Sequence, residues 1–130
     1  MICIRKLADG DIEPLFALME REGEEWRDYW HNNCKAKYLK ALENSITYLI
    51  FENDILCGFA RCRDDDGYGI YVCDLLVDKE YRGKEYGRML MEQACAEHSG
   101  MPTYVMSDVD EYYEKLGYER MGSIFKVRLR

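Results

Sequence analysis

The sequence predicts a mixed α/β fold, in which one sheet is flanked by helices. Between residues 45 and 77, three runs rich in β-branched and aromatic residues follow one another, separated by the turn-forming segments Glu52–Asp54 and Asp64–Gly67. Before and after this block, apolar residues recur at helical spacing. A chain of 130 residues can bury one core but not two. We therefore expect residues 1–130 to form a single domain.

The N-terminal part is expected to contain a strand and two helices. Residues 2–6 alternate weakly, as a first strand would. After Asp11, one buried helix face is indicated by the i, i+3, i+4, i+7 spacing of Ile12, Leu15, Phe16 and Met19. A less regular helical stretch, from about Glu24 to Glu43, follows Gly23.

Strands and helices then alternate through the rest of the chain. The strand expected at Tyr68–Val77 is apolar enough at its end to be central in the sheet. The helix expected at residues 86–97 should end at His98-Ser99-Gly100. In chain order we expect strands at Ile46–Phe51, Ile55–Arg63 and Tyr68–Val77, a helix at Tyr86–Glu97, a strand at Pro102–Met106, a helix at Val109–Leu116, and one or two strands within Tyr118–Leu129.

Composition excludes several classes of protein. A net charge of −7 argues against nucleic acid, which requires a basic footprint, but suits a cationic substrate. No run of about 18 apolar residues is present, so no membrane span is expected. The absence of a CxxC pair or Cys/His cluster indicates no disulfide framework and no metal site. We expect a reducing compartment, the cytoplasm, from the scattered cysteines Cys3, Cys34, Cys57, Cys62, Cys73 and Cys95.

The segment Asp74–Leu90 runs from a strand end through a basic turn into a helix. The N–H groups and dipole of a helix N-terminus attract anions, and Gly83 and Gly87 allow a phosphate to approach the backbone. Such turns are also common for structural reasons alone. Fixed positive charge is added here by Arg82, Lys84 and Arg88.

This segment resembles the pyrophosphate loop of the GNAT superfamily of N-acetyltransferases, Arg/Gln-x-x-Gly-x-Gly/Ala after a strand ending in Leu-x-Val. The chain offers Leu75-Leu76-Val77 and then Tyr81–Gly87. Tyr112–Tyr118 resembles the family's Phe-Tyr-Glu-Lys-Leu-Gly-Phe segment, and Asn53–Ala60 its hairpin. The resemblance covers nearly the whole chain. It implies a GNAT-like acyl-CoA N-acyltransferase fold with a mixed, mostly antiparallel central sheet flanked by helices.

The resemblance also implies an activity: transfer of an acetyl group from acetyl-coenzyme A, as co-substrate and without a metal, to a primary amine by direct attack in a ternary complex. The Leu75 N–H would hold the acetyl carbonyl oxygen, and Val77 the pantetheine arm. Glu85 departs from the family pattern, because a glycine is usual there and a carboxylate repels a pyrophosphate. We expect weakened cofactor binding. The full set of cofactor-binding residues implied is Leu75, Leu76, Val77, Arg82, Gly83, Lys84, Glu85, Tyr86, Gly87 and Arg88.

The same resemblance assigns Tyr113 as the acid that protonates the coenzyme A thiolate. A phenol, with an ordinary pKa of about 10, is suited to that transfer. A core aromatic is the alternative role, since the chain has 11 tyrosines.

The general base is left open. The family's strand glutamate matches Tyr71 or Cys73 here, and neither is a carboxylate. Asp74 is the nearest one, but strict alternation turns it to the opposite face unless the strand is bulged. A water chain is another alternative, as are Glu24 and Glu25.

Trp26, Tyr29 and Trp30 fall where the family's acceptor site is walled by the first two helices. They would form an aromatic cage for a cation, or else pack in the core. The expected partner is a small cationic amine, with no nucleic acid and no membrane, and a homodimer is left open. Two alternatives to that activity remain: a non-catalytic module that binds acetyl-CoA, and a peptide or protein N-acetyltransferase.

Overall fold

The computed structural model describes all residues, 1–130. Its five strands form one sheet in the order β1-β2-β3-β4-β5. The first three pairings are antiparallel and the last, between β4 and β5, is parallel, so the predicted mixed α/β sheet is confirmed. The strands are β1 (Ile2–Lys6), β2 (Ile46–Glu52), β3 (Ile55–Asp64), β4 (Ile70–Val77) and β5 (Thr103–Val105).

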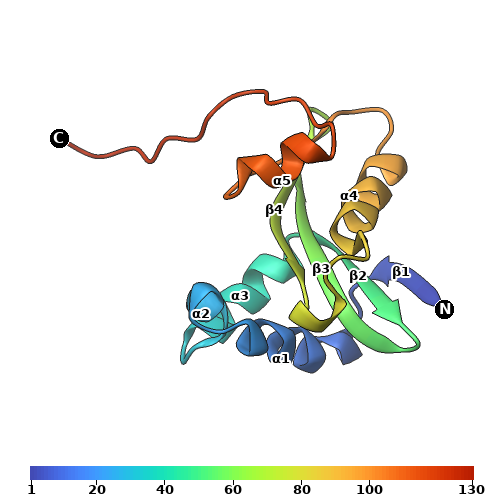
Figure 1. The fold of residues 1–130 in the computed structure, drawn as a ribbon. Coiled ribbons are helices and arrows are strands. Elements are labelled where there is room, and N and C mark those ends of the chain that lie inside the picture. The colour runs from blue at the N-terminus through green and yellow to red at the C-terminus, as the bar shows by residue number, and fades with distance from the viewer.

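Helices cover both faces of the sheet (Figure 1). They are α1 (Ile12–Glu22), α2 (Arg27–Trp30), α3 (Cys34–Glu43), α4 (Tyr86–Glu97) and α5 (Asp110–Lys115), with short 3₁₀ turns at residues 9–11, 24–26 and 79–81. None of them combines the length and the apolar composition that crossing a membrane requires.

The strands separate two hydrophobic clusters. In β2, the fully buried side chains of Tyr48 and Ile50 belong to the cluster under α4, whereas Leu49 between them belongs to the cluster under α1 and α3. This is the period of two expected of a strand that is covered on both faces. The helical faces read from the sequence are also confirmed, because Leu15 and Met19 of α1 are fully buried.

One extra residue in β4 changes which way its side chains point. Arg61 of β3 pairs with Asp74, but the next residue, Cys62, pairs with Val72, so Cys73 is a β-bulge. A bulge shifts the alternation of the residues that follow it. The carboxylate of Asp74 therefore lies on the α1–α3 face, where it contacts Tyr38.

Strands β4 and β5 lie together over only part of their length. Ile70–Val72 pairs with Thr103–Val105, and the last contact is a 3.4 Å hydrogen bond from the Met106 N–H to the Val72 carbonyl. Beyond this point no strand pairs with residues 75–77 on the β5 side. The end of β4 therefore has an open backbone edge.

Two sequence expectations are wrong. The helical stretch from Glu24 to Glu43 is interrupted at residues 31–33, where Asn32 adopts a left-handed φ of 49°, a conformation that asparagine tolerates. The expected strands within Tyr118–Leu129 are absent, and the C-terminal segment extends away from the other elements (Figure 1). An alternating pattern forms a strand only where a second strand supplies its hydrogen bonds, and no strand of the same chain pairs with this one.

Strands β3 and β4 approach each other closely at Gly58, so a side chain there should destabilise the fold. A Cβ on residue 58 would lie 2.7 Å from the Leu76 carbonyl oxygen and 3.3 Å from the Val77 Cα, both backbone atoms. We expect Gly58→Ala to lower the free energy of unfolding by about 1–3 kcal/mol, measured by urea denaturation. Gly10→Ala is the control, since nothing lies within 4 Å of its Cβ position. Equal stability of both variants would contradict the close approach.

Candidate active site

The open edge of β4 presents backbone donors. The Asp78 N–H donates to the Cys57 carbonyl of β3 at 2.7 Å, so residue 78 faces β3. Because backbone groups alternate in direction along a strand, the N–H groups of Leu75 and Val77 point the other way, toward the open edge. The Val77 carbonyl on that edge accepts a 3.0 Å hydrogen bond from Arg82 Nε. The edge can thus receive an extended chain of another molecule by strand-like hydrogen bonds.

The turn between β4 and α4 requires residues with positive φ. Gly83 has a φ of 86° and Glu85 a φ of 63°, and Glu85 directly precedes the first residue of α4. The left-handed conformation costs a non-glycine residue roughly 1 kcal/mol. A glycine would adopt this conformation without that cost, and this chain adopts it with a glutamate.

Three elements converge at Gly87, in the first turn of α4. A Cβ at this position would lie 2.8 Å from the hydroxyl oxygen of Tyr112 on α5, 3.6 Å from Leu75 Cδ2 and 3.8 Å from Val77 Cγ2. A side chain at position 87 would require the Tyr112 hydroxyl to move, because α4, α5 and the end of β4 meet at this glycine. The open edge of β4 therefore leads directly to the N-terminus of α4.

Each cation predicted in the turn has a carboxylate partner. Arg82 pairs with Glu22 at 2.7 Å, Lys84 with Glu52 at 3.1 Å, and Arg88 with Glu85 at 3.2 Å and with Glu92 at 2.6 Å. These cations are partly exposed, and exposed pairs of this kind contribute only about 0–1 kcal/mol each. An anion bound at the helix N-terminus would compete with these carboxylates, and the exchange would cost little.

Asp74 lies at the centre of a buried polar cluster on the α1–α3 face. Its Oδ2 accepts a 2.7 Å hydrogen bond from the Tyr38 hydroxyl and a 2.6 Å hydrogen bond from Arg61 Nε. Arg61 also donates to Ser45 Oγ at 3.1 Å. Burial, and then the negative charge of Asp74, raise the pKa of Tyr38 above its usual value, which keeps this phenol a hydrogen-bond donor.

Two of the three predicted acceptor-site aromatics join this cluster. The ring of Tyr29 lies 4.9 Å from Tyr38 and 5.4 Å from Trp26, whose ring in turn contacts Phe59 at 5.9 Å. Trp30 packs against the same hydrophobic cluster, but its ring meets His31 at 5.7 Å, and its Nε1 donates to the Gly23 carbonyl at 3.3 Å.

The alternative bases Glu24 and Glu25 are surface residues. Both side chains are exposed, and Glu24 forms an ion pair with Arg27 at 3.4 Å. Neither makes a hydrogen bond or an ion pair with Asp74. Of the carboxylates considered from the sequence, only Asp74 is part of the buried cluster.

Tyr113 is half-buried at the base of α5. Its ring stacks on Tyr118 with centroids 6.4 Å apart and meets Tyr112 edge-on at 5.0 Å. Burial, with smaller contributions from Tyr112 and Asp108, raises the pKa of Tyr113 to about 12. The phenol is thus protonated throughout the neutral range, as a proton donor must be.

The sequence reasoning missed two residues of this region. The hydroxyl of Tyr112 lies over Gly87, although the motif drew attention to Tyr113. Burial is the main cause of the raised pKa of Tyr29 and of Tyr113, and the charge of Asp108 adds a smaller contribution to the pKa of both. Asp108 precedes Tyr113 by five residues and belongs to no motif, so the sequence carried no signal for it.

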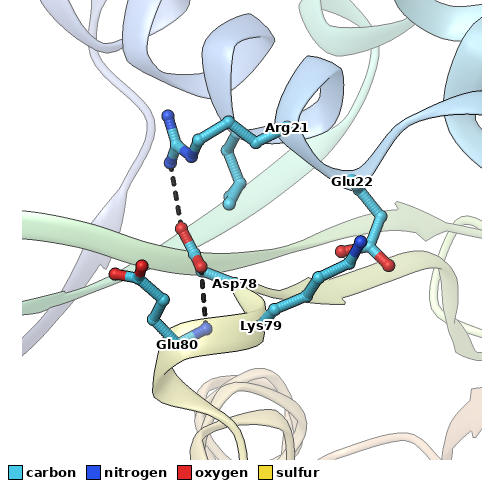
Figure 2. Close-up of a pocket in the computed structure, with 6 residues that line it drawn as sticks. Arg21, Glu22, Asp78, Lys79 and Glu80 are labelled. Atoms are coloured by element: carbon cyan, nitrogen blue, oxygen red, sulfur yellow. Dashed lines mark hydrogen bonds and ion pairs between the residues drawn. The ribbon is translucent and has the colours of Figure 1, made fainter.

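A charged cavity lies beside the turn, between the C-terminal end of α1 and the segment after β4 (Figure 2). Arg21 donates to Asp78 Oδ2 at 3.1 Å, and Asp78 Oδ1 accepts from the Glu80 N–H at 3.0 Å (Figure 2). The cavity has a volume of about 320 Å³ and is lined by Leu18, Arg21, Glu22, Asp78, Lys79 and Glu80. No sequence pattern predicted this cavity.

Comparison with known proteins identifies the family. Residues 43–120, more than half of the chain, match the family model described as the acetyltransferase (GNAT) domain. An uncharacterized N-acetyltransferase, ycf52, of Porphyra purpurea is 31% identical over 99 residues, which span 68% of this chain and 57% of that protein. Histone acetyltransferase TAP1 of Glycine max is 27% identical over 130 residues, 85% of this chain and 53% of that protein. The chain thus spans little more than half the length of these relatives.

Solved structures share the fold. A GNAT family acetyltransferase from Streptococcus pneumoniae TIGR4 superposes with a TM-score of 0.73 at 23% identity, covering 99% of this chain and 100% of that one. Aminoglycoside N-acetyltransferase AAC(6')-Iy in complex with CoA superposes with a TM-score of 0.73 at 14% identity, covering 100% of this chain and 95% of that one. The fold and the family match agree: the chain belongs to the GNAT family of acetyltransferases.

The left-handed conformation of Glu85 generates a prediction on stability. Glu85→Gly should raise the free energy of unfolding by up to about 1 kcal/mol, because glycine adopts this conformation without the Cβ penalty. Glu85→Gln is the matched control: it also removes the ion pair with Arg88 but keeps the Cβ. Thermal denaturation of the three proteins would show it. A glycine variant no more stable than the glutamine variant would contradict the argument.

Proposed function

We propose that this chain transfers an acetyl group from acetyl-coenzyme A to the primary amine of a small cationic molecule, by direct attack in a ternary complex. The observation that carries the proposal is the unpaired edge of β4, where the N–H groups of Leu75 and Val77 have no strand partner. The side chains of the same two residues contact the first turn of α4 at Gly87. In this proposal residues 1–130 form one catalytic domain.

The residues at the open edge fit such a co-substrate. An extended amide-containing arm suits the strand-like donors of Leu75 and Val77, and a pyrophosphate suits the N-terminus of α4 and the exposed turn residue Gly83 before it. Arg82, Lys84 and Arg88 would exchange their carboxylate partners for phosphate oxygens. The remaining loop residues, Leu76, Gly83, Glu85 and Tyr86, would shape the turn.

The acceptor amine would lie on the α1–α3 face, near Asp74. The carboxylate of Asp108 and the faces of Trp26 and Tyr29 favour a positively charged acceptor, whereas the charge of Asp74 is offset by its ion pair with Arg61. Similar folds include an enzyme named as an aminoglycoside N-acetyltransferase, which is consistent with a small amine. We propose Asp74, directly or through water, as the group that receives the amine proton, because the bulge at Cys73 turns it to this face.

Tyr113 would supply the proton that the departing thiolate requires. Its raised pKa keeps the proton on the phenol at neutral pH, and the ring contacts with Tyr112 and Tyr118 hold its orientation. General acid catalysis of this kind typically contributes about 10²- to 10⁴-fold to the rate.

A second candidate function is a module that binds acetyl-coenzyme A without turnover. The observation that favours it is that Arg82, Lys84 and Arg88 are each already paired with a carboxylate. Thiol release from acetyl-coenzyme A, measured against a panel of polyamines, aminoglycosides, amino acids and peptides, distinguishes the two functions. Release above the background with one of these amines supports the enzyme, and binding without release supports the module.

We also propose a cytoplasmic location. All six cysteines are free thiols, and Cys57 and Cys62 are buried among apolar side chains, which fits a reducing compartment. One relative is named as a chloroplastic protein, and a chloroplast location is the outcome that would replace this proposal.

Cofactor binding should depend on the cations of the turn. A ligand that binds only the folded state raises the melting temperature, and at about 100 times Kd it adds about 2.7 kcal/mol. We expect acetyl-coenzyme A to stabilise the wild type, and Arg82→Ala/Lys84→Ala to weaken Kd and to reduce its salt dependence. Lys37→Ala/Lys40→Ala, the same charge change on exposed positions of α3, is the control. Equal affinity of both double variants would mean that the turn is only structural.

Tyr113→Phe should lower kcat by about 10²- to 10⁴-fold while Kd for acetyl-coenzyme A and the melting temperature change little. The ring and its stacking are kept, and only the proton is lost. Tyr118→Phe on the facing ring is the control and should retain activity. A loss of turnover in Tyr112→Phe but not in Tyr113→Phe would transfer the role to Tyr112, whose hydroxyl lies over Gly87.

A further inference from the structure

Arg63, near the end of β3, has no carboxylate partner. Every other arginine of residues 1–120 forms an ion pair with a carboxylate. Three aspartates, Asp64–Asp66, follow Arg63 directly, but Asp64 accepts a 3.2 Å hydrogen bond from the Gly67 N–H inside the turn instead. An exposed, unpaired guanidinium in a protein of net charge −7 is available to an anion of another molecule.

The side chain of Arg63 lies on the same face of the sheet as Asp74. Its neighbour Cys62 is buried in the cluster under α4. Because side chains alternate along a strand, Arg63 points to the opposite face, as Arg61 does where it contacts Asp74. The cover of α3 reaches only as far as Arg61, which donates to Ser45 at the end of that helix. Arg63 lies one step beyond this cover and is exposed.

Two tyrosines form an aromatic surface beside Arg63. Tyr71 of β4 pairs with Arg63 in the register, and Tyr104 of β5 pairs with Tyr71. The two rings lie 5.3 Å apart and are tilted by 33°. Both side chains are only partly buried, and neither belongs to or packs against the two hydrophobic clusters. These rings can therefore cover the apolar part of a bound molecule.

The register gives the distance between Arg63 and Asp74. Arg61 pairs with Asp74, and Arg63 follows two residues later, which is about 7 Å along the strand. The charge of Arg63 acts on Cys73, next to Asp74: burial raises the pKa of this thiol, and Arg61 and then Arg63 oppose the rise. An extended carbon chain advances about 1.3 Å per bond, so about five methylene groups span the distance from an amine at Asp74 to an anion at Arg63.

A carboxylate suits Arg63 better than a phosphate does. One guanidinium can bind one carboxylate through two parallel hydrogen bonds. A phosphate brings up to about two negative charges. The exposed carboxylates of Asp64–Asp66, which follow Arg63 in the chain, would repel the second charge.

We propose that Arg63, with Tyr71 and Tyr104, binds the carboxylate end of the acceptor, and that the acceptor is an ω-amino acid whose amine reaches Asp74. The guanidinium holds the carboxylate, and the two rings cover the carbon chain. This inference rests on the proposed function, because it assigns the far end of the molecule whose amine is acetylated.

Two matched amines test the proposal: 6-aminohexanoate, and n-pentylamine, which has the same chain without the carboxylate. We expect wild-type kcat/KM to be about 10- to 100-fold higher for 6-aminohexanoate, as a hydrogen-bonded charge pair would give. Arg63→Gln should lower this ratio to about 1, and Arg63→Lys should keep part of it, because lysine retains the charge but not the paired hydrogen bonds. Arg120→Gln, which removes an exposed arginine paired with Asp110, is the control and should keep the wild-type ratio.

Direct binding separates this inference from the proposed function. Calorimetric titration with 6-aminohexanoate, without acetyl-coenzyme A, should show weaker binding to Arg63→Gln than to the wild type by a similar factor. Equal kcat/KM for the two amines in the wild type, or an unchanged ratio in Arg63→Gln, overturns the inference and leaves the function in place. No thiol release with any amine, together with weaker binding to Arg63→Gln, removes the function but supports the carboxylate site. Equal affinity of both proteins, or no binding to either, overturns the site itself.

Discussion

The site depends on one irregularity of backbone pairing, the β-bulge at Cys73. Without the extra residue, Asp74 would lie on the same face as Val72, under α4. The bulge turns Asp74 toward Tyr38 and Arg61 instead, and returns Leu75 and Val77 to the side of the α4 cluster. Just beyond it, β4 separates from β5, which leaves backbone donors without a strand partner. Bulges are frequent next to active sites because they redirect side chains and end pairing.

The turn after β4 shows how backbone conformation and charge are balanced in an acidic protein. Positive φ at residues 83 and 85 brings the chain round into α4. The glutamate at position 85 adopts a conformation better suited to glycine, and its carboxylate lies 3.2 Å from Arg88 rather than alone at the helix N-terminus. Because Arg88 lies beside Glu85, its positive charge would offset part of the repulsion between this carboxylate and a bound phosphate, even after Arg88 turned to the phosphate. The acidic partners of Arg82 and Lys84 keep the turn neutral until an anion competes for it.

Helix α5 lies between the edge strand β5 and the exposed C-terminal residues. Its tyrosines pack beside the open end of β4, where Tyr112 meets Gly87. The segment before α5 includes β5, the edge of the sheet. The segment after it ends in residues 121–130, where exposed apolar side chains alternate with lysine and arginine.

Apart from the break at residues 31–33, the sequence by itself determined the elements up to α5 and the family, because local patterns are enough to specify them. The alternation of β2, the spacing of α1 and the glycine-bearing turn before α4 all depend on residues near one another in the chain. The position of Asp74 could not be settled in this way, since a bulge depends on how two strands align. The contact of Tyr112 with Gly87 and the influence of Asp108 on Tyr29 join segments that no local pattern relates. The C-terminal residues 121–130 show the opposite case, because their alternation is typical of a strand but they form none. A strand forms only where another edge accepts its hydrogen bonds, and tertiary structure alone decides where that edge lies.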